Sequence, residues 1–321
     1  MTKILKRIFI IILAVVILAV AGILLLFAYV NHKNKNYYKY ATPAGEIEKK
    51  YTAPGAYDVS FAEFVADNKK YVKYEVWYPS EINDNPNTYP LVVMVNGTGV
   101  KASQYKEVFN HLASWGFIVV GNEDENSRSG GSSAASLDFM LKRNADENSE
   151  FYGKIDIENV GIAGHSQGGV GAINAVTAQT NGSIYKAMFT ASATSKYWGQ
   201  DNVFGAEWTY DASKIKIPYF MVAGTGNTDA GTAKDITATE GQGICPLWSM
   251  KENYNAVPNS ITKLMSREVG KDHGDMLRYA DGYMTAWFMY YLKKEISADF
   301  FSGDNAEILS NKNWQDTDKN L

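Results

Sequence analysis

The hydrophobic pattern at the start of the chain differs from that of the remainder. Residues 8–30 form an apolar run without a charged side chain, and Lys3, Lys6 and Arg7 precede it. As a helix, this run would span about 34 Å at about 1.5 Å per residue, which is enough for a hydrocarbon core of about 30 Å. We therefore expect residues 1–30 to form a membrane anchor, with the large remaining part of the chain on the outer side.

A basic segment before an apolar run is also the layout of a cleavable signal peptide. Residues 19–21, Ala-Val-Ala, imitate a cleavage site, but they lie inside the apolar run, which favours an uncleaved signal anchor. Lys33, Lys35 and Lys39 nearly balance the basic residues on the near side, so charge alone leaves the orientation open. If the segment is cleaved, the protein would be secreted.

After an expected linker at residues 31–55, short apolar runs alternate with longer amphipathic ones. The short runs predict buried strands, and the longer ones, with apolar positions three and four residues apart, predict helices. The first two strands should form an antiparallel pair, and the later ones should be parallel because helices separate them. The predicted strands cover residues 57–65, 71–78, 90–95, 116–120, 159–163, 186–190, 217–223 and 261–269, and the predicted helices cover residues 103–115, 132–144, 169–176 and 275–294.

This order of elements predicts an α/β fold, with a mostly parallel sheet of the eight-stranded type and helices on both faces. One such domain should fill residues 56–300, and the polar residues 301–321 should form a loosely packed C-terminal tail. No long insertion separates the strands, so we expect no large lid domain. Functional side chains in such a fold belong at the carboxyl ends of the strands.

Composition and charge narrow the possible functions. The 321 residues carry a formal net charge of −4, and no basic patch suited to nucleic acid is present in the sequence. Cys245 is the single cysteine, so no internal disulfide can form and no Cys/His cluster offers a zinc site. We therefore expect neither a metal nor another cofactor, and the sequence does not indicate an oligomeric state.

The pentapeptide Gly164–Gly168 has the form G-x-S-x-G, with Ser166 at its centre. An apolar predicted strand precedes it and a predicted helix of small apolar residues follows it. A serine at such a corner is held in a strained turn with its hydroxyl exposed, and the helix N-terminus supplies free N–H groups. The alternative is a glycine-rich turn without a catalytic role, but the strand and the helix favour a nucleophile.

A nucleophilic serine requires a general base, and only four histidines are available. His32 adjoins the apolar segment, His111 is predicted to be a surface or capping residue within a helix, and the ring of His165 should point away from the Ser166 hydroxyl. His273 remains, in a loop after the last predicted strand. We interpret it as the base, against the alternative of an ordinary surface histidine.

The base in turn needs a carboxylate to orient it. Asp229 is the first carboxylate after the strand that ends at residue 223, and it is the predicted acid. Asp235 and Glu240 are the alternatives. Asp272 adjoins the predicted base and should serve the loop rather than the ring.

The developing oxyanion should be received by backbone N–H groups. One would belong to Gln167, the residue after the nucleophile. The other would belong to Thr98, in the loop Asn96–Gly99 that follows the strand at residues 90–95. A simple glycine turn is the alternative for this loop.

With these motifs, residues 56–294 resemble the α/β-hydrolase family, and within it the dienelactone-hydrolase-like and bacterial cutinase-like esterases. The resemblance implies a serine carboxylic-ester hydrolase that forms an acyl-enzyme without a cofactor, with Ser166, His273 and Asp229 as catalytic triad. The chain departs from the family pattern in having Asn96-Gly97 where lipase-like members often have His-Gly, and Asn227 near the usual aspartate position. It also lacks the disulfides usual in cutinase-like members.

The resemblance leaves the substrate open: a small-molecule, lipid or polymer ester would suit an exported enzyme. Four aromatic residues are candidates to line its pocket, although they could simply cover the sheet edge: Tyr105, Trp198, Trp208 and Trp248. An acyltransferase using the same triad is one alternative function. A catalytically inactive, membrane-anchored binding module is the other.

Overall fold

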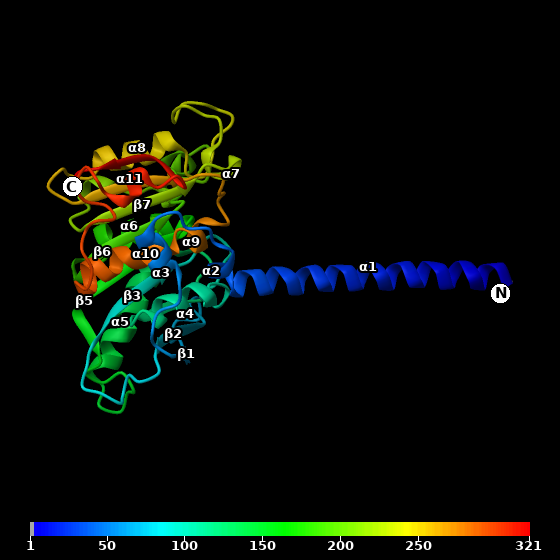
Figure 1. The fold of residues 1–321 in the computed structure, drawn as a ribbon, viewed down its shortest axis with the longest axis horizontal. Helices are drawn as coiled ribbons and strands as arrows, with labels where there is room; N and C mark the ends of the chain where they lie inside the picture. The colour runs from blue at the N-terminus through cyan, green and yellow to red at the C-terminus, as the bar shows by residue number, and fades with distance from the viewer. Residues whose placement is uncertain (1–2) are drawn as a thin grey trace. The chain divides into compact units, whose positions relative to one another are not determined.

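The computed structural model describes residues 3–321 and divides the chain into two compact units, Met1–Ala41 and Thr42–Leu321. The first unit contains α1 (Lys3–Lys35) and the short α2 (Tyr37–Tyr40). Helix α1 is continuous over 33 residues and is long and apolar enough to cross a membrane (Figure 1). Its length and composition fit a signal anchor or a signal peptide. We call the second unit the main domain.

The main domain contains a nine-stranded sheet in the order β1-β2-β4-β3-β5-β6-β7-β8-β9. Strands β1 and β2 are antiparallel, as predicted, and the strands from β4 to β8 across the centre are parallel. The mostly parallel sheet of the sequence prediction is therefore present. The strands are β1 (Val59–Val65), β2 (Lys73–Pro79), β3 (Tyr89–Val95), β4 (Ile118–Asn122), β5 (Ile155–His165), β6 (Tyr185–Ala191), β7 (Tyr219–Gly224), β8 (Lys263–Glu268) and β9 (Trp314–Lys319).

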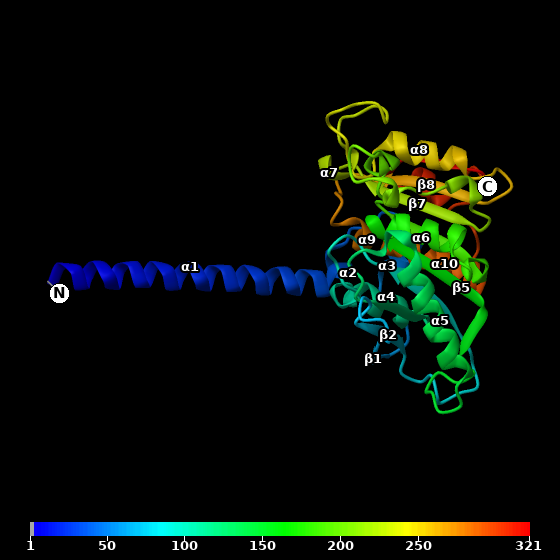
Figure 2. The same cartoon turned by 180° about the vertical axis from the view of Figure 1, so that it is seen from behind.

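Helices cover both faces of the sheet, and the central strands show this directly. Every residue of β3 is buried, and its side chains point alternately into two separate hydrophobic cores. Val92 and Met94 belong to the first core, and Leu91 and Val93 belong to the second. Figure 1 looks onto the face covered by α10 (Asp281–Phe288), and Figure 2 onto the face covered by α5 (Gly131–Ala145) and α6 (Gln167–Ala178). Continuous apolar strands are the sequence pattern of a sheet buried in this way.

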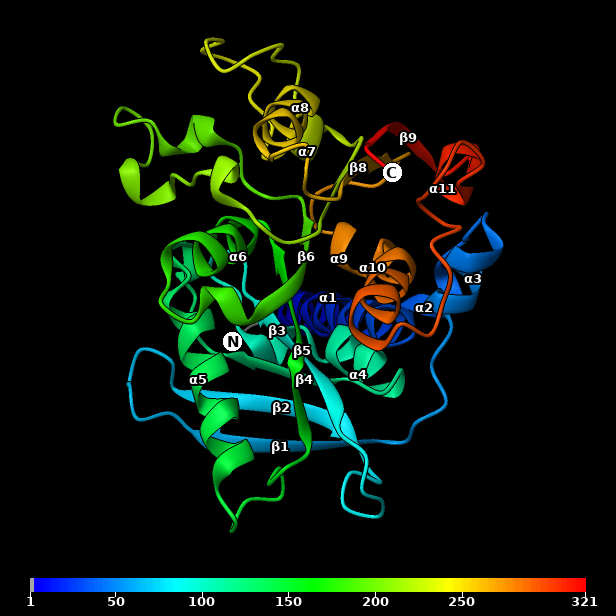
Figure 3. The ribbon, with the colours of Figure 1, turned by 90° about the vertical axis from the view of Figure 1, so that its left-hand side faces the viewer.

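The two helical layers stand on opposite sides of the strands in Figure 3. Helix α4 (Lys106–Ser114) packs with α10 in the first core, and α5 and α6 contribute to the second. The helix predicted at residues 275–294 is divided into α9 (Met276–Tyr279), α10 and a π-helical turn at Met289–Lys293. Helices α7 (Asn227–Ala230) and α8 (Leu247–Ala256) were not predicted.

The segment predicted as a linker, residues 31–55, contains a helix that packs into the main domain. Helix α3 (Glu46–Thr52) lies so close to α10 that a Cβ on Gly282 would meet Thr52 Oγ1 at 2.4 Å. A helix of seven residues is too short to show the repeated apolar spacing on which the prediction depended. The main domain therefore begins earlier than the sequence suggested.

The segment predicted as a loose tail, residues 301–321, instead completes the sheet. Its strand β9 pairs antiparallel with β8, and α11 (Glu307–Ser310) precedes that strand. The Glu307 carboxylate accepts hydrogen bonds from the backbone N–H groups of Ile47 (2.7 Å) and Glu48 (3.0 Å). It therefore caps the N-terminus of α3 and joins the two ends of the main domain.

His111 is buried rather than at the surface, so its interpretation as a surface residue is wrong, and it contacts the C-cap residue of α3 instead of lying free on its own helix. Its Nδ1 lies 2.6 Å from Asp281 Oδ2, and its Nε2 donates to the carbonyl oxygen of Ala53 at 2.9 Å. Burial alone would lower the pKa of His111, but the Asp281 carboxylate and nearby carbonyl oxygens raise it above its ordinary value. The helical pattern around His111 could not predict its contact with Asp281, because Asp281 lies far away along the chain.

This buried pair should make the stability of the main domain fall as the pH rises. Because the folded-state pKa of His111 is raised, its stabilisation is complete below about pH 6.5 and is lost as the pH passes the folded-state value. Denaturant unfolding of the full chain in detergent micelles between about pH 6 and about pH 9 measures this loss.

His111→Leu should lower the free energy of unfolding by about 3–5 kcal/mol at about pH 6, because it removes the cation beside a buried carboxylate. An unchanged pH dependence in that variant would contradict the assignment.

Candidate active site

A sharp turn between β5 and α6 presents the hydroxyl of Ser166. This residue has φ 60° and ψ −124°, a combination that residues other than glycine rarely adopt. A Cβ on Gly164 would lie 2.0 Å from the carbonyl oxygen of Gly168, and one on Gly168 would lie 2.1 Å from that of Val95. The two glycines are therefore required by the close approach of neighbouring backbone, as the G-x-S-x-G motif predicts.

The structure brings the three predicted catalytic side chains together. His273 Nε2 lies 2.9 Å from Ser166 Oγ, and His273 Nδ1 lies 2.7 Å from Asp229 Oδ1. The carboxylate is fully buried, whereas the imidazole keeps about 20% of its surface exposed. With Nδ1–H donating to the carboxylate, Nε2 presents a lone pair to the serine hydroxyl, which is the arrangement that a general base requires.

The second oxygen of the Asp229 carboxylate is held by donors from the ends of two neighbouring strands. Ser192 Oγ donates to Oδ2 at 2.5 Å, and the backbone N–H of Gly224 donates to the same atom at 2.8 Å. Ser192 follows β6 and has a positive φ of 52°, a strained conformation that turns the chain at the sheet edge. These donors fix the carboxylate plane in front of the histidine.

Asp272 joins the loop that carries Asp229 to the loop that carries His273. Among the described residues, no hydrogen bond connects its carboxylate to the imidazole ring of His273. Its Oδ1 accepts from the backbone N–H groups of Asp229 (2.9 Å) and His273 (2.8 Å), and its Oδ2 accepts from that of Thr228 (3.2 Å). Burial alone would raise the pKa of Asp272, but these donors lower it below its ordinary value. The contacts agree with the expectation that Asp272 serves the loop.

The two residues predicted to receive an oxyanion are linked by their side chains. Gln167 Nε2 donates to Thr98 Oγ1 at 2.9 Å. As the first residue of α6, Gln167 keeps its backbone N–H outside the hydrogen-bond ladder of the helix. The Thr98 loop is held by the Asn96 amide, which donates to the carbonyl oxygens of Asn122 (2.6 Å) and Asp124 (2.9 Å). Asn96 thus fixes this loop to the end of β4.

A chain of hydrogen bonds connects the Thr98 loop to the loop of the base. The backbone N–H of Gly97 donates to the Tyr105 hydroxyl at 3.1 Å, and this hydroxyl lies 3.3 Å from His165 Nδ1. His165 Nε2 lies 2.8 Å from the carbonyl oxygen of His273, to which it can only donate. His165 is therefore the Nε2–H tautomer, and its Nδ1 accepts the Tyr105 proton.

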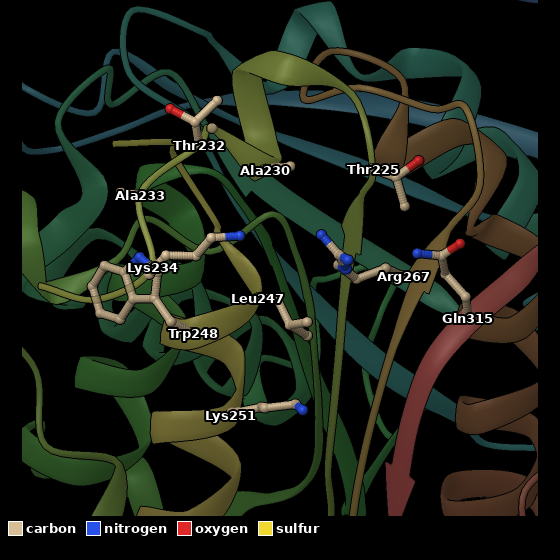
Figure 4. Close-up of a pocket in the computed structure, with 11 residues that line it drawn as sticks. Thr225, Ala230, Thr232, Ala233, Lys234, Leu247, Trp248, Lys251, Arg267 and Gln315 are labelled. Carbon is tan, nitrogen blue, oxygen red and sulfur yellow. The ribbon is translucent and has the colours of Figure 1, made fainter. Parts of the chain in front are cut away.

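The four aromatic residues predicted to line a substrate pocket occupy different places. Tyr105 is buried, with its hydroxyl between Gly97 and His165, and so belongs to the scaffold of the site. Trp198 and Trp208 are half-buried after β6, and each packs against the exposed ring of Phe204, with centroid distances of 5.1 and 5.2 Å. Trp248 lines a separate cavity whose lining includes none of the three catalytic candidates (Figure 4).

Sequence reasoning missed Ser192, and it predicted Tyr105 to line a substrate pocket rather than to hold the scaffold of the site. Ser192 stands in a run of small polar residues directly after a buried strand, between the strands that precede Ser166 and Asp229. That position at the carboxyl edge was the available signal. The structural role of Tyr105 had no comparable signal, because it depends on a contact with His165 across 60 residues.

His165 should remain neutral throughout the ordinary pH range. Burial lowers its pKa to about 4, and the nearby His273 ring disfavours a second positive charge. Nitrogen-15 NMR of the full chain in detergent micelles should show the Nε2–H tautomer at His165 from about pH 8 down to about pH 5. Tyr105→Phe should change the Nδ1 shift, because it removes the proton that this atom accepts. Protonation near the ordinary histidine value of about 6.5 would contradict the hydrogen-bond chain.

Comparison with known proteins identifies the family of the chain. Residues 33–238 match the family model described as PET hydrolase-like, a range that includes Ser166 and Asp229 and ends before His273. A stretch of 199 residues is 28% identical to chlorophyllase-1, chloroplastic, of Citrus unshiu and of Citrus sinensis, over 59% of this chain and 55% of each relative. The chain therefore spans about half the length of these curated relatives. The family match covers more than half of the chain, and with it the predicted fold class is confirmed: the chain belongs to the PET hydrolase-like family and has the α/β-hydrolase fold.

Proposed function

We propose that the main domain is a serine carboxylic-ester hydrolase that acts through Ser166, His273 and Asp229. The observation that supports this most strongly is the position of the His273 ring, 2.9 Å from a serine hydroxyl and 2.7 Å from a buried carboxylate. These partners are 107 and 44 residues away along the chain, so local sequence does not explain their meeting. Proteins of both matched kinds, PET hydrolase-like proteins and chlorophyllases, hydrolyse carboxylic esters.

In this mechanism His273 removes the Ser166 proton as the serine oxygen attacks the ester carbonyl. Asp229 keeps the ring in the required tautomer and stabilises the imidazolium that forms. The imidazolium then protonates the leaving alcohol, and an acyl-enzyme remains. Water, activated by the same imidazole, hydrolyses the acyl-enzyme and regenerates the serine.

The backbone N–H groups of Thr98 and Gln167 would receive the tetrahedral oxyanion. A donor of this kind contributes about 2.7–4 kcal/mol to the stability of the transition state. The Gln167 side chain, bonded to Thr98 Oγ1, keeps the two segments in register before substrate binds. The donors are thus preorganised, which is the condition for such stabilisation.

The acyl or alcohol part of the substrate would pack against the aromatic segment after β6. The backbone N–H of Thr194 donates to the carbonyl oxygen of Ser166 at 3.2 Å, so the segment starts beside the nucleophile. Beyond it, the Phe204 ring stacks on Trp198 and packs at a tilt against Trp208, and Phe204 is 54% exposed. A partly exposed aromatic cluster favours apolar or aromatic esters, including lipid and polymer esters.

We further propose that α1 anchors the enzyme to a membrane, with the main domain on the outer side. The support is the length and apolar composition of α1 and the basic residues before it. An anchored esterase would act on esters at or near the cell surface.

Hydrolysis of nitrophenyl acetate, butyrate and benzoate by the full chain tests the proposed function. Ser166→Ala should lower turnover by about 10⁴-fold or more, and Asp229→Asn by about 10⁴-fold, because the ring then takes the wrong tautomer. Phe204→Ala should raise KM for benzoate more than for acetate. Ser183→Ala, at an exposed serine outside the site, is the matched control and should keep wild-type turnover.

Two outcomes would decide against this function. Equal turnover in Ser166→Ala and wild type would exclude Ser166 as the nucleophile, and no turnover of any ester by the wild type would favour a binding module. Adding an alcohol acceptor separates hydrolysis from acyl transfer, because a transferase would form the new ester in preference to the free acid.

A further inference from the structure

A cavity opens at the carboxyl edge of the sheet, and none of the proposed triad residues lines it. It has a volume of about 550 Å³, within the range of small-molecule sites. Its walls come from Thr225 after β7, from Ala230 and the loop that follows it, from α8, and from β8 and β9. Ala230 directly follows Asp229 within the short α7, so this helix contributes one residue to the proposed triad and the next to the cavity wall.

Three basic side chains line this cavity (Figure 4). Lys234 and Lys251 extend toward Arg267 from two different elements. Among the described residues, neither lysine has a carboxylate partner within ion-pair distance. No aspartate or glutamate is present among the residues that line the cavity. The cavity therefore has an excess of positive charge.

Arg267 is oriented by one carboxylate at the rim. Its Nε and Nη2 donate to Asp316 Oδ2 at 2.9 and 2.6 Å, and the Gln315 amide donates to the same oxygen at 2.9 Å. Asp316 has a positive φ of 54°, so the strand is strained where it presents this carboxylate. The three basic side chains and the single carboxylate of Asp316 together give the cavity a net charge of about +2 at neutral pH.

Other donors and two apolar side chains complete the lining. The hydroxyls of Thr225 and Thr232 and the Gln315 amide can donate to an acceptor. The Trp248 indole N–H is buried and has no acceptor among the described residues. The side chains of Leu247 and Trp248 form an apolar wall beside the basic groups.

We propose that this cavity binds the phosphate group of an organic phosphate ester. A phosphate carries a charge near −2 when esterified once and offers more acceptor oxygens than a carboxylate, which suits a site with three cations and several further donors. The apolar wall of Leu247 and Trp248 contacts the organic part. The site stands independently of ester hydrolysis, because none of its lining residues belongs to the proposed triad or oxyanion pair.

Calorimetric titration of the full chain in detergent micelles tests the site with three probes: inorganic phosphate, glycerol 3-phosphate and the diester glycerophosphoglycerol. Lys234→Ala/Lys251→Ala should weaken binding of the preferred probe by at least about tenfold, because two charge-assisted contacts are lost. Lys142→Ala/Lys186→Ala removes the same charge from exposed positions outside the cavity and should change the affinity less than about twofold. Ser166→Ala should bind as the wild type does, so a failure of the catalytic proposal is separate from a failure of this one.

The probe that binds most tightly identifies the source of the phosphate. Preference for glycerol 3-phosphate indicates a soluble phosphate monoester, and preference for the diester indicates a lipid headgroup or a phosphodiester polymer. Equal weakening by the two double variants would overturn the proposal, because the effect would then be general surface charge. Absence of binding at millimolar probe, or equally tight binding of succinate, would overturn it as well.

Discussion

The buried carboxylate of Asp229 is the constraint on which the arrangement of the site depends. An ionised carboxylate removed from water is costly unless its oxygens accept hydrogen bonds. Here the donors are Ser192 Oγ, the backbone N–H of Gly224 and His273 Nδ1, at 2.5, 2.8 and 2.7 Å. Ser192 follows β6, Gly224 ends β7, and His273 lies in the loop after β8. The carboxylate therefore accepts all three hydrogen bonds only if these parallel strands end at one edge of the sheet. The fold thereby determines the direction of the imidazole ring, and with it the proposed chemistry.

Much of this edge could be predicted because the sequence marks it with short-range signals. Short, largely apolar runs identified the eight strands from β1 to β8, and the G-x-S-x-G motif identified the turn at Ser166. With the nucleophile placed, four histidines were few enough for elimination, and the strand-end rule then indicated His273 and Asp229. The structure brings these three side chains within hydrogen-bond distance. Their catalytic roles remain a proposal.

The features that the sequence did not reveal depend on contacts between distant segments. Helix α3 is short, and β9 has the polar sequence Trp-Gln-Asp-Thr-Asp-Lys, so neither shows an apolar period. Glu307 caps α3 from 260 residues away. His111 and Tyr105 resemble ordinary helix residues until Asp281 and His165 are placed beside them. Pattern analysis identifies elements, whereas such pairings follow only from the three-dimensional packing of those elements.

The central claim is that a carboxylate-oriented His273 activates Ser166, and covalent labelling tests it most directly. The rate at which a fluorophosphonate modifies the full chain can be followed by intact mass spectrometry, and peptide mapping locates the modified residue. The account predicts a single adduct at Ser166, formed about 10²–10⁴-fold more slowly in His273→Ala, because the serine then lacks its general base. An adduct at another residue, or an unchanged rate in that variant, would contradict it.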